Sequence, residues 1–408
     1  MRFSLNFIKE FLDIELAPSK LAQILTMAGM EVEGFKQLGA DWVFDIEVTT
    51  NRYDWLSMTG IAREIAAILG KKLNISQPPV LGGKNYWSRS IKIEDNQDCS
   101  CYVARVLREV NVVSSSCQTQ QLLFNCGLTS VNNVVDITNY CMLKWGNPLH
   151  AFDEDKIQGN VCVRRAREGE VFLGIDDKQR TLTGQNLVVA DDKKVIALAG
   201  VMGAKNTEVT NQTKNIFLEA AIFSPLTVRR SRRAAGLDTE ASYRFERAVS
   251  ADNLECACRE AAFLMTKKCS GIYAGECSRG RMPAAKRKKI TLDLDKLSGY
   301  LGLVYPKTKV KKILCSLGCG LREISNKVLS ITPPRLRFDI EKEIDIYEEV
   351  SRIFGYDKIP SRIPFLSASS YEHSRRRQSY AFNNRIKDCA ALMGFKEIVT
   401  YSVESEET

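Results

Sequence analysis

Two short segments interrupt the regular pattern of apolar residues and divide the 408-residue chain into blocks. Residues 74–90 contain two prolines and two glycines, and residues 282–289 pass from a proline into four consecutive basic residues. Proline and glycine break helices and strands, so both segments are predicted to be linkers. A chain of this length also exceeds what one hydrophobic core usually serves. The predicted domains are 1–85, 86–285, 286–362 and 363–408.

The blocks differ in the periodicity of their apolar residues, which indicates both helices and strands. The predicted helices cover residues 58–69, about 253–268 and about 340–354, and the predicted strands cover 44–48 and much of 91–282. The block after residue 290 mixes the two types. The predicted fold class is therefore α+β, multidomain.

The composition is that of a globular protein without a membrane segment. Hydrophobic residues make up 44% of the chain and charged residues 26%. No apolar run approaches the roughly 18 residues that cross a bilayer. The N-terminus turns charged at Lys9 and Glu10, so it lacks the apolar core of a signal peptide. These features predict a cytoplasmic location.

The thirteen cysteines are scattered, and only two histidines accompany them. No C-x-x-C pair occurs, so a four-ligand zinc site cannot be assembled from recognisable spacings. The cysteines are predicted to be reduced and packed as small apolar residues.

Three basic runs stand out against a moderate net charge of +9: Arg229–Arg233, Lys286–Lys289 and Arg375–Arg377. One interpretation is that they are solvated surface. The other is contact with a polyanion such as RNA, where each neutralised phosphate releases counterions. The charge permits nucleic-acid binding and does not decide between the two interpretations.

Several motifs follow one another along the chain. They are Gly60-Ile-Ala-Arg-Glu-Ile-Ala-Ala67, Val131-Asn-Asn-Val-Val-Asp136, Asn147-Pro-Leu-His-Ala-Phe-Asp153, Ala199-Gly-Val-Met-Gly203, Leu237-Asp-Thr-Glu-Ala-Ser-Tyr-Arg-Phe-Glu-Arg247 and Glu348-Glu-Val-Ser-Arg-Ile-Phe-Gly-Tyr-Asp357. Each is moderately specific alone. In this order they resemble the N-terminal half of the beta subunit of bacterial-type phenylalanyl-tRNA synthetase.

The resemblance implies a B1-type N-terminal domain, a β-rich B3/B4-type editing domain, a helix-turn-helix-like B5-type domain and the start of a class II synthetase-like domain. It also implies an alpha-two beta-two tetramer, in which the alpha subunit uses ATP to charge tRNA(Phe) with phenylalanine. This chain is then expected to hydrolyse misacylated Tyr-tRNA(Phe). A phenylalanine pocket rejects tyrosine only by excluding one oxygen, so a second selection step is needed.

Glu219 is the one acid in the apolar run from Ile216 to Phe223. From its context alone it is either an edge-strand glutamate facing water or a buried acid. The resemblance implies that it reads the tyrosine hydroxyl, which satisfies a buried carboxylate that phenylalanine leaves unpaired. His150 matches the family's histidine and is expected to position the hydrolytic water or the terminal ribose, since no Ser–His–Asp or Cys–His set has usable spacing.

The same resemblance gives substrate-binding roles to Gly200, Gly203, Thr239 and Ala241. Glycine lets a backbone approach a ligand closely, although ordinary turns use glycine too. Thr239 and Ala241 also fit a turn that precedes a helix.

Four acids lie close together near a predicted helix. Asp345, Glu348 and Glu349 stand at i, i+3 and i+4, and Asp339 precedes them. One account is neutralisation by nearby basic residues, namely Arg337, Lys342 and Arg352. The resemblance instead implies that the four bind Mg²⁺ shared with the alpha subunit, which suits oxygen ligands. Like charges at this spacing repel, so amides at the three helix positions are expected to leave the thermal midpoint unchanged or slightly raised.

Three departures from the family pattern leave alternatives open. The tRNA-binding OB module near residues 37–41 is absent, the family's C-terminal domains do not follow Thr408, and Thr129 replaces the usual arginine. The last residues predict a helix through 390–393 and a strand-like run over 397–403, so the chain is expected to be a fragment or a reduced subunit. The alternatives are a structural beta subunit with decayed editing, a free-standing trans-editing hydrolase, and a non-catalytic nucleic-acid-binding protein.

Overall fold

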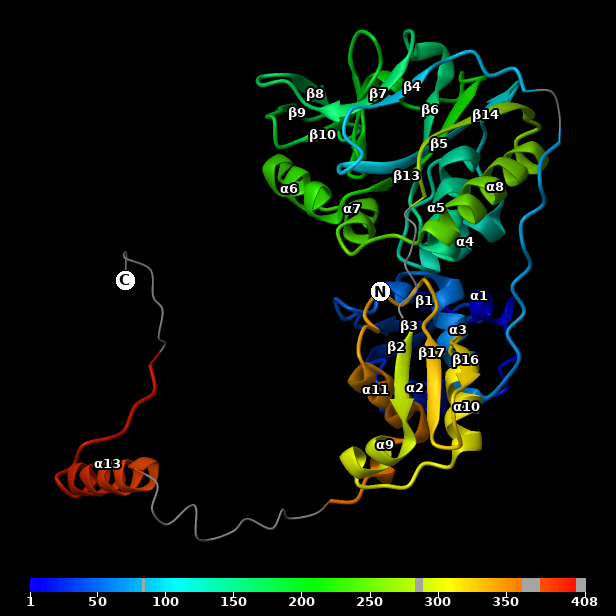
Figure 1. The fold of residues 1–408 in the computed structure, drawn as a ribbon. Coiled ribbons are helices and arrows are strands. Elements are labelled where there is room, and N and C mark those ends of the chain that lie inside the picture. Colours follow the sequence, from blue (N-terminus) through cyan, green and yellow to red (C-terminus); the bar gives the residue numbers. More distant parts are fainter. Residues whose placement is uncertain (83–84, 283–288, 362–374, 401–408) are drawn as a thin grey trace. The chain divides into compact units, whose positions relative to one another are not determined.

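The computed structural model describes residues 1–82, 85–282, 289–361 and 375–400. The chain divides into two compact units, Met1–Ile359 and Pro360–Thr408. The first unit consists of three successive segments, each with its own sheets (Figure 1). Within the described ranges no helix combines the length and the apolar character that crossing a lipid bilayer requires. All thirteen cysteines are free.

The N-terminal segment is a three-stranded antiparallel sheet with helices packed on it. Its elements are β1 (Arg2–Ser4), α1 (Leu5–Lys9), α2 (Pro18–Met27), β2 (Val32–Leu38), β3 (Asp41–Ile46) and α3 (Met58–Leu69), with strand order β1-β3-β2. Ser57 is the N-cap of helix α3, with its Oγ accepting a hydrogen bond from the Gly60 amide, and Gly70, with φ of 63°, is the C-cap. Glycine adopts this left-handed conformation without steric cost. The predicted helix over residues 58–69 is confirmed, whereas the predicted strand lies at Asp41–Ile46 rather than 44–48.

The middle segment contains two sheets that face each other. The four-stranded sheet has the order β14-β5-β13-β6, from β5 (Cys99–Arg108), β6 (Leu149–Asp153), β13 (Ile216–Phe223) and β14 (Ile272–Gly280). The five-stranded sheet has the order β12-β11-β10-β7-β4, from β4 (Ile91–Ile93), β7 (Val161–Arg165), β10 (Leu187–Ala190), β11 (Val195–Leu198) and β12 (Met202–Gly203). Strands β8 (Val171–Leu173) and β9 (Gln179–Thr181) pair with each other as an antiparallel two-stranded ribbon.

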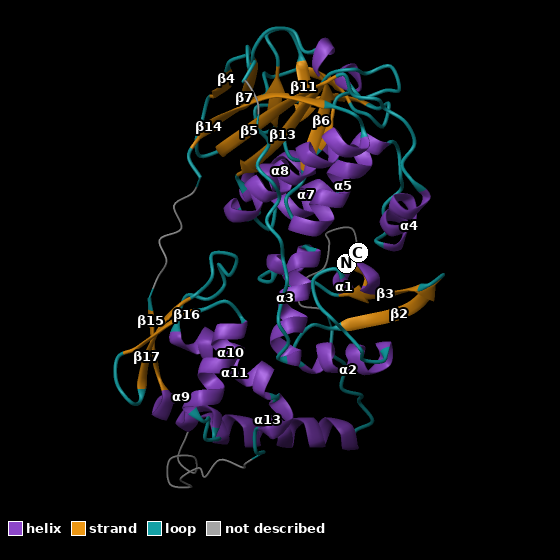
Figure 2. Ribbon diagram, turned by 90° about the vertical axis from the view of Figure 1, so that its right-hand side faces the viewer, coloured by secondary structure: helices purple, strands orange, loops and turns teal. Residues whose placement is uncertain are grey.

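Helices cover the outer face of the four-stranded sheet. The helices of this segment are α4 (Cys117–Asn125), α5 (Asn133–Trp145), α6 (Pro225–Ala235), α7 (Glu240–Phe245) and α8 (Ala251–Lys268). Figure 2 shows α5 and α8 along one side of strands β5, β13 and β6. The predicted helix near 253–268 is confirmed.

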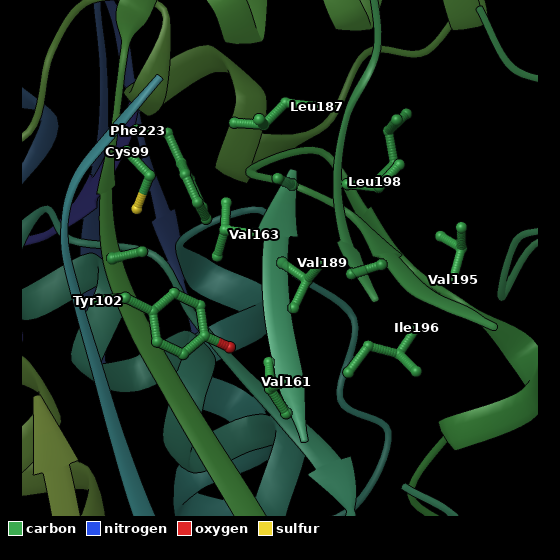
Figure 3. Packing of buried hydrophobic residues seen from close by; sticks show 14 of the residues in the cluster. Cys99, Tyr102, Val161, Val163, Leu187, Val189, Val195, Ile196, Leu198 and Phe223 are labelled. Carbon is green, nitrogen blue, oxygen red and sulfur yellow. The ribbon is translucent and has the colours of Figure 1, made fainter. Parts of the chain in front are cut away.

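Strand β13 is buried on both faces, so its side chains divide between two cores. Phe217, Ala221 and Phe223 join the core between the two sheets, together with Tyr102 of β5. Leu218 and its alternating neighbours instead pack against α5 and α8. Figure 3 shows Tyr102 and Phe223 on one side of the inter-sheet core, facing the valines of β7 and β10. Glu219 has the parity of the inter-sheet face, because successive side chains of a strand alternate.

The third segment is a small α/β unit. Its elements are β15 (Ile290–Asp293), α9 (Leu294–Leu301), α10 (Lys307–Ser316), β16 (Gly320–Glu323), β17 (Val328–Thr332) and α11 (Glu343–Phe354), with strand order β15-β17-β16. The predicted helix over about 340–354 is confirmed, starting three residues later than expected. Together the three segments confirm a multidomain α+β fold.

A ladder of buried ion pairs connects α3 with α11. Glu64 of α3 accepts a hydrogen bond from Arg52 (2.7 Å) and, on its other oxygen, one from Arg352 of α11. Burial raises the pKa of Glu64, but the charges of Arg352 and Arg52 outweigh burial and lower that pKa to about 2. The N-terminal and third segments are therefore joined by a charged contact that excludes water.

Glu349 of α11 continues the ladder. Arg352 donates to its two carboxylate oxygens at 2.8 and 2.6 Å, and Arg337 does so at 2.7 Å for each. Glu349 is 3% exposed. Burial raises its pKa, but hydrogen bonds from the two arginines hold the pKa well below the usual range. The expectation that amides at Asp345, Glu348 and Glu349 leave stability unchanged rests on repulsion between like charges, and that premise does not hold for Glu349, which two arginines bind.

The second unit contains one described helix, α13 (Arg375–Leu392). The described residues that follow it, up to Thr400, hold no strand. The predicted strand-like run over 397–403 is therefore wrong in its first four residues, and the remainder lies outside the described residues.

We expect Glu349→Gln to lower the free energy of unfolding of the first unit by about 3–5 kcal/mol, because two buried guanidinium groups lose their common carboxylate. The matched control is Glu348→Gln, at an exposed position on the same helix. This control is expected to change the unfolding free energy by less than about 0.5 kcal/mol. Urea unfolding followed by circular dichroism measures both, and equal stability of the two variants would contradict the buried role of Glu349.

Candidate active site

A pocket opens where the edge of the four-stranded sheet meets the β11–β12 connection and α7. Its volume is about 370 Å³, counted with its open mouth. The lining residues are Pro148, Leu149, His150, Ala197, Leu198, Gly200, Val201, Met202, Gly203, Glu219, Ala241 and Phe245. Strands β6 and β13 therefore supply one wall, and the β11–β12 region with α7 supplies the other.

Glu219 enters this pocket from β13. Its side chain is 6% exposed, and Oε2 accepts a hydrogen bond of 2.6 Å from the hydroxyl of Tyr102 on β5. Burial raises the pKa of Glu219 to about 7, although the Tyr102 hydrogen bond acts to lower it. Burial therefore favours the protonated carboxyl group, and a pKa raised in this way is common among functional acids.

His150 stands directly opposite Glu219 on the neighbouring strand β6. Its ring packs edge-on against Phe152, with 4.4 Å between the ring centroids. Burial lowers the pKa of His150 to about 4. The imidazole is therefore neutral at physiological pH, and a neutral imidazole can accept a proton from a water molecule.

The two predicted glycines line the pocket for different steric reasons. Gly200 has φ of 69°, and a Cβ added there would lie 3.0 Å from Phe245 and 3.1 Å from Phe223. A Cβ at Gly203 would collide with the ring of His150. The backbone of β12 therefore passes directly against the histidine, which only glycine permits.

Thr239 and Ala241 belong to the start of α7 but do different things. Ala241 lines the pocket. Thr239 is the N-cap of α7: its Oγ1 accepts from the Ser242 amide and donates to the carbonyl of Val201 at 2.9 Å. The structure thus brings His150, Glu219, both glycines and Ala241 together in the pocket. Thr239 does not line the pocket, but its hydrogen bond to Val201 connects α7 with the β11–β12 wall.

Two family models match this chain. The B3/4 domain model matches residues 98–270, and the tRNA synthetase B5 domain model matches residues 290–356. Among curated proteins, the phenylalanine–tRNA ligase beta subunit of Fusobacterium nucleatum is 34% identical over 400 residues, covering 98% of this chain and 49% of that protein. The protein of the same name from Rhodopirellula baltica is 37% identical, covering 100% of this chain and 60% of that protein. The chain carries the B3/4 and B5 domains and is similar over nearly its whole length to phenylalanine–tRNA ligase beta subunits.

The chain spans about half the length of the curated beta subunits that it matches. A solved N-terminal fragment of the phenylalanyl-tRNA synthetase beta subunit from Pyrococcus horikoshii covers 87% of this chain and 99% of its own, with 17% identity and a TM-score of 0.47. The resemblance predicted from the motifs is confirmed. Both matched domains lie inside the predicted ranges 86–285 and 286–362.

The four acids that the resemblance predicts to bind Mg²⁺ do not form one site in this chain. Glu349 and Asp339 both bind Arg337. Asp345 accepts from the backbone amides of residues 341 and 342 at the start of α11, while Glu348 is exposed. Among the described residues no group of three or more acidic, histidine or cysteine side chains is arranged to hold a metal ion. These carboxylates do not fit a shared ion as they stand, and the magnesium role stays a prediction.

Sequence reasoning missed Tyr102 and Phe245. Tyr102 lies 117 residues before Glu219, and only the pairing of β5 with β13 makes them neighbours. The available signal was a tyrosine within the apolar strand 99–108, because a buried tyrosine needs a partner for its hydroxyl. Phe245 was inside the matched motif, but its contact with Gly200 depends on how α7 folds back.

The basic run 229–233 lies on α6, where Ser231 is buried and Arg232 is half-buried. Val228, on the inner face of α6, lies close to the pocket-lining Gly200: a Cβ added at Gly200 would be 3.1 Å from the Val228 side chain. Arg229, Arg230 and Arg233 are exposed, and no ion pair involves them among the described residues. Arg232 is instead held by acids of the α6–α7 region. Three uncompensated positive charges therefore lie on the helix that backs the pocket.

We expect Glu219→Gln to stabilise the chain relative to wild type, increasingly so as pH rises. The carboxyl pKa is 4.5 in the unfolded chain and about 7 in the folded one. The wild-type chain therefore has its full free energy of unfolding below pH 4.5 and loses part of it as pH rises to about 7, because the unfolded chain releases the proton first. The full difference corresponds to about 3 kcal/mol. Urea unfolding between pH 4.5 and 8 measures it, with Glu94→Gln, at an exposed position, as the control. A pH-independent difference would contradict the buried, protonated carboxyl.

Proposed function

We propose that this chain is an editing beta subunit of phenylalanine–tRNA ligase, which hydrolyses Tyr-tRNA(Phe) made in error. The observation that carries the proposal is a buried acid whose carboxylate is fixed on one side and borders a pocket on the other. A neutral histidine opposite the acid and similarity to beta subunits support the same conclusion.

Selection of tyrosine rests on the burial of Glu219. The hydroxyl of a tyrosyl ring in the pocket would donate a hydrogen bond to the carboxylate, whereas a phenylalanyl ring would cover the carboxylate and leave it unsatisfied. Leaving a buried charged acceptor unpaired costs about 1–3 kcal/mol or more. The site therefore rejects the correct product by a penalty and accepts the wrong one by a hydrogen bond.

Hydrolysis needs a water molecule beside the ester. We assign its placement to His150, whose neutral ring can accept a proton as the water oxygen attacks the carbonyl carbon. The bond from that carbon to the ribose oxygen then breaks, and the proton passes to the ribose oxygen. Burial holds the pKa of His150 at about 4, so the ring stays neutral and can orient the water throughout the physiological pH range, while its basicity is weak.

The RNA would be held by the arginine face of α6. Arg229, Arg230 and Arg233 suit phosphates because a guanidinium binds phosphate oxygens through paired N–H donors. The position of the family's usual arginine, Thr129, is exposed in the loop between α4 and α5. We propose that α6 supplies positive charge that Thr129 does not.

The remaining assignments follow from the family and are proposals as well. They are an alpha-two beta-two assembly with an alpha subunit that uses ATP, binding of tRNA(Phe), a cytoplasmic location, and domains at 1–85, 86–285, 286–362 and 363–408. Magnesium shared with the alpha subunit would require Arg337 and Arg352 to release Glu349, because both now occupy its oxygens.

Glu219→Ala is expected to reduce the ratio of hydrolysis rates on Tyr-tRNA(Phe) and Phe-tRNA(Phe) about 5- to 150-fold, which corresponds to the loss of about 1–3 kcal/mol of selectivity. His150→Ala should slow both reactions about 10²-fold or more and leave the ratio nearly unchanged. The control Glu94→Ala should change neither. Deacylation of both charged tRNAs, corrected for spontaneous hydrolysis, gives these ratios.

Two outcomes of this experiment would reject parts of the proposal. A Glu219→Ala variant that keeps the wild-type ratio would show that Glu219 does not read the hydroxyl. A wild-type chain that hydrolyses neither tRNA, with an alpha subunit present, would favour a structural beta subunit with decayed editing.

Replacing Arg229, Arg230 and Arg233 together with glutamine is expected to weaken tRNA binding and to make the slope of log K against log salt less steep by about 2, because three phosphate contacts are lost. The control replaces Lys92, Lys267 and Lys268, three exposed lysines on β4 and α8, and removes the same charge. Fluorescence titration at several salt concentrations measures both slopes. Equal slopes for the two triple variants would show that α6 is not a specific RNA contact.

A further inference from the structure

Among the residues that the structure describes, Tyr102 is the one outside the pocket whose side chain binds Glu219. Its side chain extends from β5 into the core between the sheets and is fully buried (Figure 3). Its hydroxyl donates to Oε2 of Glu219 at 2.6 Å. Because the ring is packed on all sides, the position of this hydroxyl is fixed by the core rather than by the pocket.

The hydrogen bond makes the two carboxylate oxygens of Glu219 unequal. Oε2 is bound to a group that does not line the pocket, while Oε1 has no partner among the described residues. Glu219 itself lines the pocket. One oxygen therefore anchors the side chain, and the other is available to a ligand.

We propose that Tyr102 is the positioning residue that sets the specificity of this pocket, by holding Oε2 of Glu219 so that Oε1 accepts the hydroxyl of a tyrosyl substrate. The inference rests on the proposed function and adds a residue that acts through Glu219 without touching the substrate. A hydrogen-bonded carboxylate has a single orientation, and a single orientation is what distinguishes a ring with a hydroxyl at one position.

Tyr102 also controls which form of Glu219 the substrate meets. An ionised carboxylate can only accept hydrogen bonds, so it requires a hydroxyl donor, whereas a protonated carboxyl can donate and is less selective. The titratable side chains around Glu219 on the adjacent strands are Tyr102 and Cys99 on β5 and His150 on β6. Burial raises the pKa of Glu219, and Tyr102 is the neighbour that lowers it.

The first test uses Tyr102→Phe in the full chain, with tRNA(Phe) charged with tyrosine or phenylalanine. A hydrogen bond to a charged group shifts a pKa by about one unit or more. The wild-type rate ratio should fall as pH drops through about 7, and in Tyr102→Phe this decline should move up by about one pH unit or more. At pH 7.5 the ratio should fall roughly three- to tenfold, and it should recover toward pH 9. A purely structural role would lower activity at every pH without moving the profile.

The matched control is Tyr273→Phe, on the neighbouring strand β14, whose hydroxyl interacts with Glu276 outside the editing pocket. This variant should keep the wild-type ratio and the wild-type pH profile. A change in Tyr273→Phe equal to that in Tyr102→Phe would overturn the specific role of Tyr102.

The second test does not depend on hydrolysis. The difference in unfolding free energy between the parent and its Glu219→Gln variant reports the titration of Glu219, and it can be measured with and without Tyr102→Phe. The midpoint of that difference should move to higher pH when Tyr102 is replaced. An unchanged midpoint together with an unchanged rate ratio would overturn the proposal.

The two tests separate this inference from the proposed function. A wild-type chain without selective hydrolysis would refute editing, while the unfolding midpoint would still decide whether Tyr102 holds the carboxylate. Should Tyr102→Phe fail to fold, the double variant with Glu219→Gln replaces it. If the double variant folds, the result would support the proposed link between Tyr102 and the Glu219 carboxyl group. If the double variant also fails to fold, the result would overturn that link.

Discussion

The burial of one carboxyl group at the centre of β13 is the constraint on which the site depends. A strand covered on both faces should be apolar throughout, and Glu219 interrupts an apolar run on the face between the two sheets. Moving a carboxylate out of water is costly, which is why burial raises its pKa to about 7. Tyr102, His150 and the glycine-lined wall together form the environment of that single carboxyl group.

The same chain treats acidic side chains in opposite ways. Glu64 and Glu349 are as buried as Glu219, yet their pKa values are lowered because arginines surround them. Glu219 has a neutral hydroxyl for its partner instead of a cation. A carboxylate paired with two guanidinium groups has no capacity left for a ligand, whereas one held by a single hydroxyl keeps an oxygen free. Burial alone therefore does not decide whether an acid can bind a ligand; the charge of its partners does.

Local patterns predicted what is locally determined. The helix over residues 58–69 follows from its apolar stripe and from Gly70, and the family followed from motifs in a common order. The partners of the acids could not be predicted, because sheet pairing and helix packing bring them together: Tyr102 is 117 residues from Glu219, and Arg352 is 288 residues from Glu64. The acids of α11 show the limit most clearly: Asp345, Glu348 and Glu349 were expected to share one face of the helix, but Glu348 is exposed and Glu349 is buried.

The contact between Glu64 and Arg352 has a consequence for the order in which the molecule can be completed. A ribosome adds roughly 5–20 residues per second, so Arg352 emerges roughly 15–60 s after Glu64. During that interval Arg52 is available to α3, but the second cation and the cover it brings with α11 are not. In the nascent chain the N-terminal segment therefore has Glu64 paired with Arg52 alone and open to water until the third segment has been synthesised.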